Sequence, residues 1–486
     1  MEFVPTCNFA TLDVFVPTTQ KPWDEKRAKH AYRRLAFGAN NAQITAALSQ
    51  TPENFIDSLI DEAINLSPTP APEWGYWSVQ DYVDNDLVYN DELRRNQTSQ
   101  MTFQFATDIL NEGLRARLVK FWSNHFVTEI SGYDCPSYQF QYYNMLQRHA
   151  LGNFKEFVRE VGINPAILIY LNGFDSTNNE PNENYSRELF ELFTLGENNG
   201  YTQSDIVETS KALTGYNVRT AECGEITFDE TTFDDGPKTI FGQTGNWGYD
   251  DVIEILFTER GNLISRFICE KLYKYFVSPN VNDDIITQLA ADFEQDFEIA
   301  PMLRRLLKSE HFFDDNAIGV IMKSPYDLTI GFLTDTGFSY DDNQLRSFMN
   351  INDDLGQRLF NPIDVAGWQG NHEWVKTDTM VGRWRAFMPF FNFIWEFHRE
   401  ELRSLAIELS GNSNDVYYVA RVIVDWFISN GLETEDAYGV AVDTFKLEIP
   451  ENYFNDGSWN LNDPEAPRQI VTLLGHIIEL PEFQLK

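Results

Sequence analysis

The side chains best placed to do chemistry lie in one short stretch, residues 181–196, which reads PNENYSRELFELFTLG. Asn184, Arg187, Glu188 and Glu191 are three or four residues apart there, and this spacing puts all four on one face of a helix. A helix with so many ionic groups on one side turns that side either to water or to a polar pocket inside the protein. The stretch is therefore the main candidate site, although its residue types name no reaction.

Two carboxylates one turn apart, Glu188 and Glu191, could hold a divalent metal together with His125 from another helix. Inward-facing Glu and His side chains hold the metals of carboxylate-bridged helical bundles. Such sites normally contain a Glu-x-x-His pair, which this chain lacks. We favour a different interpretation, a buried salt-bridge network of Arg187 with the glutamates that fixes how helices dock, because ion pairs at this spacing are common.

Two histidines could have either a functional or a purely structural role. His125 falls beside Phe121, Trp122 and Phe126, and a histidine in such surroundings is more often a hydrogen-bonded core residue than a ligand. It is also the histidine best suited to a functional role, because burial beside carboxylates tunes an imidazole. His30 lies four residues before Arg34 on a predicted helix over 24–38, and we expect that helix to be partly exposed with its polar groups satisfied.

The candidate helix carries its own start and stop signals. Asn182 is a suitable N-cap, and Gly196 can adopt the left-handed conformation that ends a helix. Tyr185, Leu189, Leu192 and Phe193 recur at helical spacing and predict the buried face.

Helical patterns occupy most of the remaining chain and predict a mainly α fold. Residues 91–129 form one long helical pattern, whereas short alternating runs over 216–248 predict a small β-hairpin insertion. Three prolines make residues 1–26 an irregular N-terminal arm, which leaves 27–486 as a single large α-helical domain.

Composition narrows the classes of partner. The formal charge of −37 repels phosphate backbones and anionic lipid, so nucleic acid is excluded as a partner. No apolar run is long enough for a transmembrane helix. The N-terminus lacks a signal peptide, which predicts a cytoplasmic protein, with export as the alternative.

Familiar catalytic and redox motifs are missing. The chain has no GxSxG elbow, no Walker loop, no GxGxxG after a strand and no HExxH. Cys7, Cys135, Cys223 and Cys269 lie far apart without a CxxC pair, so we predict free, buried thiols.

Several strings together resemble a bacterial family called domain of unknown function 1800, and the resemblance runs from about residue 27 to 484. The longest is PNENYSRELFELFTLGENNGYTQSDIVETSKALTGY; the others are HAYRRLAFGA, FWSNHFV, HALGNFKEFV, NPAILIYLNG, SRFICEKLYKYFV, KSPYDLTIGFL, NPIDVAGWQG and LPEFQ. The resemblance implies a large, mostly helical bacterial protein of unsettled activity. It also implies a neighbouring gene product, domain of unknown function 1501, whose fold is similar to phosphatases and sulfatases.

The chain matches the polar positions that are typical of the family, but it departs from the family pattern at one string. Members often read HDxGxK before the second strand of the hairpin, whereas residues 233–238 here read FDDGPK. Members also commonly carry an export signal. The residues that match the polar signature are His30, Arg34, His125, Asn182, Asn184, Arg187, Glu188 and Glu191.

Two functions follow as hypotheses. The first is a non-catalytic partner or assembly protein that acts with the neighbour of the 1501 type and uses the polar cluster structurally. The alternative is a metal-dependent enzyme whose divalent metal is bound by His125, Glu188 and Glu191.

Overall fold

The structure is a computed structural model that describes residues 11–447 and 449–486. It is mainly α-helical, and its named strands form two small antiparallel sheets. The predicted fold class is confirmed. The insertion contains two hairpins, because β1 (Tyr216–Arg219) pairs with β2 (Ile226–Phe228) and β3 (Lys238–Ile240) pairs with β4 (Gln243–Gly245).

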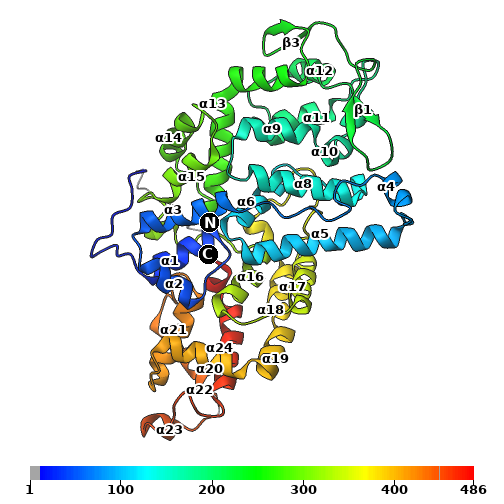
Figure 1. The fold of residues 1–486 in the computed structure, drawn as a ribbon. Coiled ribbons are helices and arrows are strands. Elements are labelled where there is room, and N and C mark those ends of the chain that lie inside the picture. Colours follow the sequence, from blue (N-terminus) through cyan, green and yellow to red (C-terminus); the bar gives the residue numbers. More distant parts are fainter. Residues whose placement is uncertain (1–10, 448) are drawn as a thin grey trace.

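The first third of the chain builds the middle of the molecule (Figure 1). Residues 11–24 contain no helix, and α1 begins two residues inside the arm expected from the sequence. The helices here are α1 (Glu25–Leu35), α2 (Asn41–Leu48), α3 (Pro52–Asn65), α4 (Val79–Asp84), α5 (Asp91–Asn111), α6 (Leu114–Ser123), α7 (Ile130–Tyr133) and α8 (Pro136–His149).

The second third forms one end of the molecule, together with both hairpins (Figure 1). The long helix α13 (Tyr249–Phe276) packs against α14 (Asp283–Phe293), α9 (Phe154–Ile163) and the π-helical turn η2 (Leu189–Thr194). The elements are α9 (Phe154–Ile163), α10 (Pro165–Tyr170), η1 (Gly173–Asp175), α11 (Glu183–Glu188), η2 (Leu189–Thr194), α12 (Gln203–Ala212), α13 (Tyr249–Phe276), α14 (Asp283–Phe293), α15 (Ile299–Leu307) and η3 (Asp315–Ala317).

The last third forms the opposite end and then returns to the middle, where the final residues lie (Figure 1). Its elements are α16 (Pro325–Thr336), α17 (Asp342–Asp354), η4 (Asn371–Trp374), α18 (Thr377–Ala386), α19 (Met388–Phe397), α20 (Arg399–Ser410), α21 (Val416–Phe427), α22 (Glu435–Lys446), α23 (Glu451–Asn455), α24 (Ala466–Glu479) and η5 (Pro481–Gln484).

Buried apolar side chains from Leu12 to Phe483 form one contact cluster, so all three parts share a core. Whether 27–486 is a single domain stays a prediction. No helix in the described ranges is both long and apolar enough to cross a membrane.

The predicted long helix over 91–129 is interrupted. Gly113 has a φ of +52°, which ends α5 and lets α6 start in a new direction. A left-handed residue costs little only when it is glycine. A single glycine in a strong helical pattern does not reveal from sequence alone that it breaks the helix.

The prediction of free thiols is wrong for two cysteines. Cys135, at the start of α8, forms a disulfide with Cys223 in the turn between β1 and β2, and their Cα atoms are 5.5 Å apart. The separation of 88 residues gave no sequence signal for this pairing. Cys269 is free and buried as predicted, whereas Cys7 lies outside the described residues.

Candidate functional site

The predicted central helix consists of an α-helical half and a π-helical half. Asn182 caps α11 by accepting a hydrogen bond from the backbone N–H of Asn184, as expected. Gly196 ends the element with a φ of +93°. Phe190 of η2 is also buried, although it lies outside the predicted apolar stripe.

The charged face of this helix lies at the boundary with solvent. Arg187 forms ion pairs with Glu183 at 3.1 Å and Glu191 at 3.2 Å, and it donates to Gln203 of α12. The Arg187 side chain is 36% exposed, so these pairs resemble surface ion pairs and each stabilises the fold by about 0.3–0.5 kcal/mol. Burial, and then the charge of Glu191, raise the pKa of Glu188 to about 6.

His125 is fully enclosed and separate from these carboxylates. Its Nε2 lies 3.0 Å from the carbonyl oxygen of Phe193, and aromatic rings surround it. Burial lowers the pKa of His125 well below its ordinary value, which keeps the imidazole neutral. Among the described residues no three His, Cys, Asp or Glu side chains meet in a group that could hold a metal ion. His125, Glu188 and Glu191 are therefore not brought together as a ligand set.

His30 and Arg34 lie inside the molecule. The prediction that their helix is partly exposed is therefore wrong for the face that carries them. His30 Nε2 is 3.0 Å from the carbonyl oxygen of Phe312, and Arg34 donates to the carbonyl of Ala317 at 2.7 Å. Burial lowers the pKa of Arg34 to about 9. The two side chains dock α1 onto the segment that precedes α16. Asn184, the remaining candidate, lies 3.5 Å from the side chain of Asn172.

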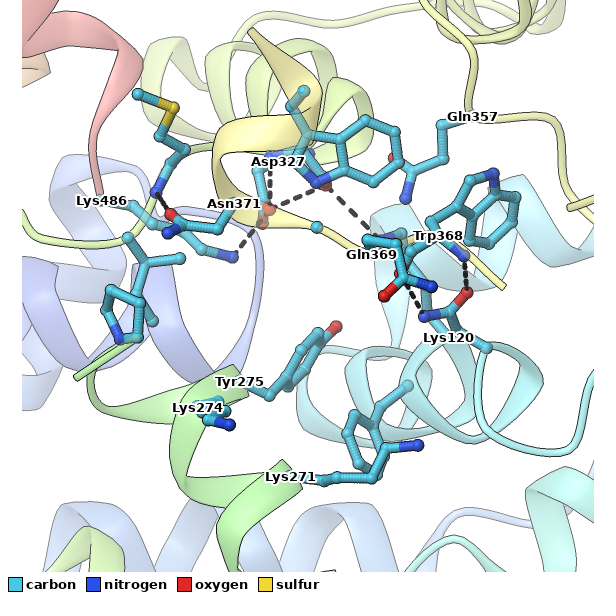
Figure 2. A pocket seen from close by; sticks show the side chains of 18 of the residues that line it. Lys120, Lys271, Lys274, Tyr275, Asp327, Gln357, Trp368, Gln369, Asn371 and Lys486 are labelled. Carbon is cyan, nitrogen blue, oxygen red and sulfur yellow. Dashed lines mark hydrogen bonds and ion pairs between the residues drawn. The ribbon is translucent and has the colours of Figure 1, made fainter. Parts of the chain in front are cut away.

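The structure offers a different cavity, of about 400 Å³, in the middle of the molecule. It lies between α6, α13, the start of α16 and the segment 366–374 (Figure 2). Four of the described residues that line it are lysines, and Asp327 is the one among them with a carboxylate side chain. An excess of cations here is unexpected in a chain with a formal charge of −37.

Asp327 is already neutralised by other partners. Its carboxylate accepts from Arg117, from Lys486 at 2.7 Å and from the Ser324 hydroxyl at 2.8 Å. Burial alone would raise the pKa of Asp327, but Arg117 and Lys486 hold it well below its usual range. The negative charge of Asp327 therefore already compensates two cations, Arg117 and Lys486, and compensates the other lysines of the cavity only in part.

Lys120 and Lys271 form no ion pair with any described residue, although the nearby charge of Asp327 acts on Lys120. Lys120 of α6 is 5% exposed, and its ammonium makes one long contact, 3.5 Å, with Ser324 Oγ. Lys271 of α13 lies over the ring of Phe267, and no ion pair to it occurs within the described residues. Burial lowers the pKa of each to about 8, and Lys274 contributes to the lowering at Lys271. Lys274 itself pairs with Glu270 at 2.6 Å.

The other wall of the cavity is a tightly anchored tryptophan segment. Asn124, the residue that follows α6, accepts from the N–H of Trp368 and donates to its carbonyl, at 2.6 and 2.9 Å. A Cβ at Gly367, which has a φ of +75°, would lie 2.4 Å from Oδ1 of Asn124. Asn371 accepts from the N–H of Met322 at 3.2 Å. Side-chain bonds therefore hold the segment in place at both ends.

Comparison with known proteins gives one match. The model of the protein family described as "Protein of unknown function (DUF1800)" matches residues 30–485. The chain belongs to the DUF1800 family. No curated protein and no solved structure matches it.

Four of the strings that carry the DUF1800 resemblance meet at the cavity: FWSNHFV, SRFICEKLYKYFV, KSPYDLTIGFL and NPIDVAGWQG. Sequence reasoning concentrated on histidines and paired carboxylates, so it missed Lys120, Lys271 and Trp368. The signal that could have found them was a lysine within or next to a family string, as in KFWSNHF and KLYK, in a strongly acidic chain.

Proposed function

We propose that this protein binds a small anionic ligand in the lysine-rich cavity. The observation that carries the proposal is the charge balance: among the described side chains that line the cavity, Lys120 and Lys271 face a single carboxylate, Asp327, which is already paired with Arg117 and Lys486. Lys120 is buried and shares the charge of Asp327 with Arg117 and Lys486, and the half-buried Lys271 has no ion pair among the described residues. Cations that are so poorly compensated are costly, and a bound anion would lower that cost.

The size and setting of the cavity suit a small molecule. Ligand pockets usually enclose about 300–1,000 Å³, and this one encloses about 400 Å³. The negative charge of the rest of the chain is screened beyond about 8 Å at physiological salt, so nearby lysines dominate the potential inside the cavity.

The test is titration calorimetry of the full chain with inorganic sulfate and phosphate at pH 7 and constant ionic strength. Charge-assisted hydrogen bonds contribute about 1.5–3 kcal/mol each, so we expect Lys120→Met or Lys271→Met to weaken binding at least about tenfold. Methionine keeps the length of the side chain and removes only the charge, so we expect both variants to fold.

The matched control is Lys376→Met, which removes the same charge from a side chain that is 59% exposed and does not line the cavity. Binding that is unchanged in the cavity variants, or equally weakened in the control, would refute the proposal. Absence of any binding by the wild-type chain would also refute it.

A second proposal is the partner role, acting with a protein of the domain of unknown function 1501 type. It is favoured by exposed apolar side chains around α4, at the edge of the molecule: Tyr76, Val83 and Val88 are 64%, 58% and 74% exposed. Apolar side chains grouped on a surface mark sites of association. We expect the wild-type chain to co-purify with that protein and a Val83→Asp, Val88→Asp variant to lose this association. A wild-type chain that does not bind that protein would contradict the role.

A further inference from the structure

A second pocket, of about 340 Å³, lies at the end of the molecule that carries both hairpins (Figure 1). It shares no described lining residue with the lysine cavity, and no Lys, Arg or His is among the described residues that line it. We propose that this pocket binds a small organic cation that carries a quaternary ammonium group. The proposal is independent of anion binding in the lysine cavity, so either can fail alone. The residues that carry it are four aromatic side chains, Tyr216, Phe228, Phe233 and Tyr249, and two carboxylates, Asp250 and Asp251.

The four aromatic rings follow one another around the pocket. Tyr216 and Phe228 are cross-strand partners in β1 and β2, and their ring centroids are 5.3 Å apart at an angle of 58°. The ring of Phe228 contacts that of Phe233 at 5.4 Å and 60°, and the ring of Tyr216 contacts that of Tyr249 at 5.8 Å and 70°. The circuit closes at Gly248, which precedes Tyr249, because a Cβ there would lie 3.7 Å from the ring of Phe233. Successive rings are steeply inclined to one another and form an aromatic rim.

The aromatic rim is ordered, yet a ligand can reach it. The disulfide of Cys135 and Cys223 ties the turn between β1 and β2 to α8, and the Tyr249 hydroxyl donates to the carbonyl of Arg159 at 2.7 Å. Phe228 is 44% exposed, although it has aromatic neighbours on two sides. A rim that is already held in place loses little entropy when a ligand binds.

The charge at the pocket is negative. Asp250 and Asp251 lie in the first turn of α13, whose N-terminus offsets only about half a charge. Arg159 pairs with Asp250 at 3.2 Å, but it shares its charge with two glutamates as well. Burial, and then the charge of Asp250, raise the pKa of Tyr216, so the field of this carboxylate extends to the rim. A cation is therefore favoured in the pocket.

One ring of the rim already interacts with a cation of the protein. The ammonium of Lys238 lies 4.9 Å from the centroid of Phe233. Lys238 is buried, pairs with Asp234 at 3.6 Å and donates to the carbonyl of Gly236 at 2.9 Å, so its charge is used outside the pocket. Within the described residues no cation lies over the ring of Phe228, which makes it the ring most available to a ligand.

A quaternary ammonium group fits these surroundings better than other cations do. Aromatic faces attract it, and it has no N–H group that burial against rings would leave without an acceptor. A primary ammonium carries three donors. A metal ion needs several converging oxygen ligands, and in the described part of the chain no three acidic, His or Cys side chains form such a group. Asp250 and Asp251 would repel a phosphate or carboxylate attached close to the ammonium, which disfavours zwitterions.

The experiment compares choline with two analogues by ligand-observed NMR titration of the full chain at pH 7 and fixed ionic strength. 3,3-Dimethylbutan-1-ol has the shape of choline without its charge, and ethanolamine has the charge without the methyl groups. We expect choline to bind at least about tenfold more tightly than either, because more than one ring attracts its charge. Absence of choline binding, or choline no tighter than the neutral alcohol, would overturn the proposal. Ethanolamine that binds as tightly as choline would overturn the quaternary group.

Phe228→Leu tests the aromatic rim, because leucine keeps an apolar side chain and removes the ring. This variant should weaken choline about threefold, the size of one exposed cation–ring contact, and leave the neutral alcohol nearly unchanged. Phe397→Leu is the matched control, since Phe397 of α19 is 63% exposed and does not line the pocket. It should change neither ligand. Choline binding that is unchanged in Phe228→Leu, or equally weakened in the control, would refute the role of the rim.

Asp250→Asn tests the negative charge and should weaken choline about twofold, as expected for an exposed carboxylate. Asp283→Asn is its matched control: both aspartates lie in the first turn of a helix, pair with an arginine and are 79% and 81% exposed. Equal weakening in the two variants would mean that choline responds only to the net charge of the chain, and it would refute a local site.

Vesicles of phosphatidylcholine distinguish a free cation from a lipid headgroup that carries the same ammonium. The phosphate of the headgroup lies close to its ammonium, so we expect the chain not to sediment with these vesicles. Sedimentation that is lost in Phe228→Leu would overturn the small free cation as the ligand.

Discussion

At the scale of residues, Asp327 connects elements that are far apart in the chain. It lies at the start of α16, where Ser324 and Asp327 form a capping box, and it also pairs with Arg117 of α6 and Lys486. Removing one partner of a buried ionic group leaves the others uncompensated. Asp327 therefore stabilises the cationic cavity as well as its own helix.

Replacing Asp327 by Asn should destabilise the protein severely. We expect the free energy of unfolding to fall by about 3–5 kcal/mol, because Arg117 and Lys486 would remain buried without a carboxylate. Urea denaturation followed by circular dichroism measures the loss. Asp283→Asn removes an 81% exposed partner of Arg266, so this control should cost below about 1 kcal/mol. Similar losses in both variants would contradict the role of Asp327.

The affinity for sulfate should depend on pH through Lys120 and Lys271. The pKa of each is about 8 in the free protein, and a bound anion favours the ammonium form. Affinity is then nearly constant below pH 7 and falls as pH rises above 8, by up to about a hundredfold per unit for two lysines. Sulfate stays fully ionised over this range, so the slope reports the protein. In Lys271→Met the slope should fall to about tenfold per unit, and an unchanged slope would contradict the assignment.

At the scale of elements, local signals were readable in the sequence and distant pairings were not. Asn182 and Gly196 lie within one stretch, so the start and the end of the central helix could be predicted from residue type. The bend at Gly113 and the π-turn in η2 depend on tertiary packing, which overrides the local pattern. The cavity joins Lys120, Lys271 and segments beyond residue 320, so no spacing rule could have found it.

The disulfide is another distant pairing that could not be predicted from the sequence. It is also relevant to the cellular compartment in which the protein folds. Cys135 and Cys223 tie the β1–β2 hairpin to the start of α8, where Tyr138 also donates to the carbonyl of Gly224. Disulfides persist in oxidising compartments and are rare in the cytosol. The bond therefore favours export, the alternative that the sequence left open.

Removing the disulfide should cost stability. For Cys135→Ser, Cys223→Ser we expect the free energy of unfolding to fall by roughly 2–5 kcal/mol, because the unfolded chain regains the freedom of a long loop. Thermal unfolding with and without a reductant measures the change. A reductant should lower the midpoint of the wild type and leave the double variant unaffected. Peptides of Cys135 and Cys223 that are found separate after non-reducing digestion would contradict the bond.

At the scale of the whole molecule, the surface and the cavity have opposite charge. The chain carries a formal charge of −37, yet Arg117, Lys120, Lys323 and Lys486 are all buried near its middle. Repulsion among surface carboxylates destabilises the compact state and is weakened by salt. The buried cations are screened less than exposed groups, and a specific anion would stabilise them.

These two effects can be separated by comparing chloride with sulfate. Sodium chloride should raise the thermal midpoint between 10 and 150 mM, since the Debye length falls from roughly 30 to roughly 8 Å over that range. Sodium sulfate at matched ionic strength should raise the midpoint further, because ligand bound only by the folded state adds stability by mass action. Lys120→Met, Lys271→Met should retain the response to chloride and lose most of the extra response to sulfate. An extra response that survives in this variant would mean that sulfate acts by general exclusion from the protein surface, and the cavity would then have no part in it.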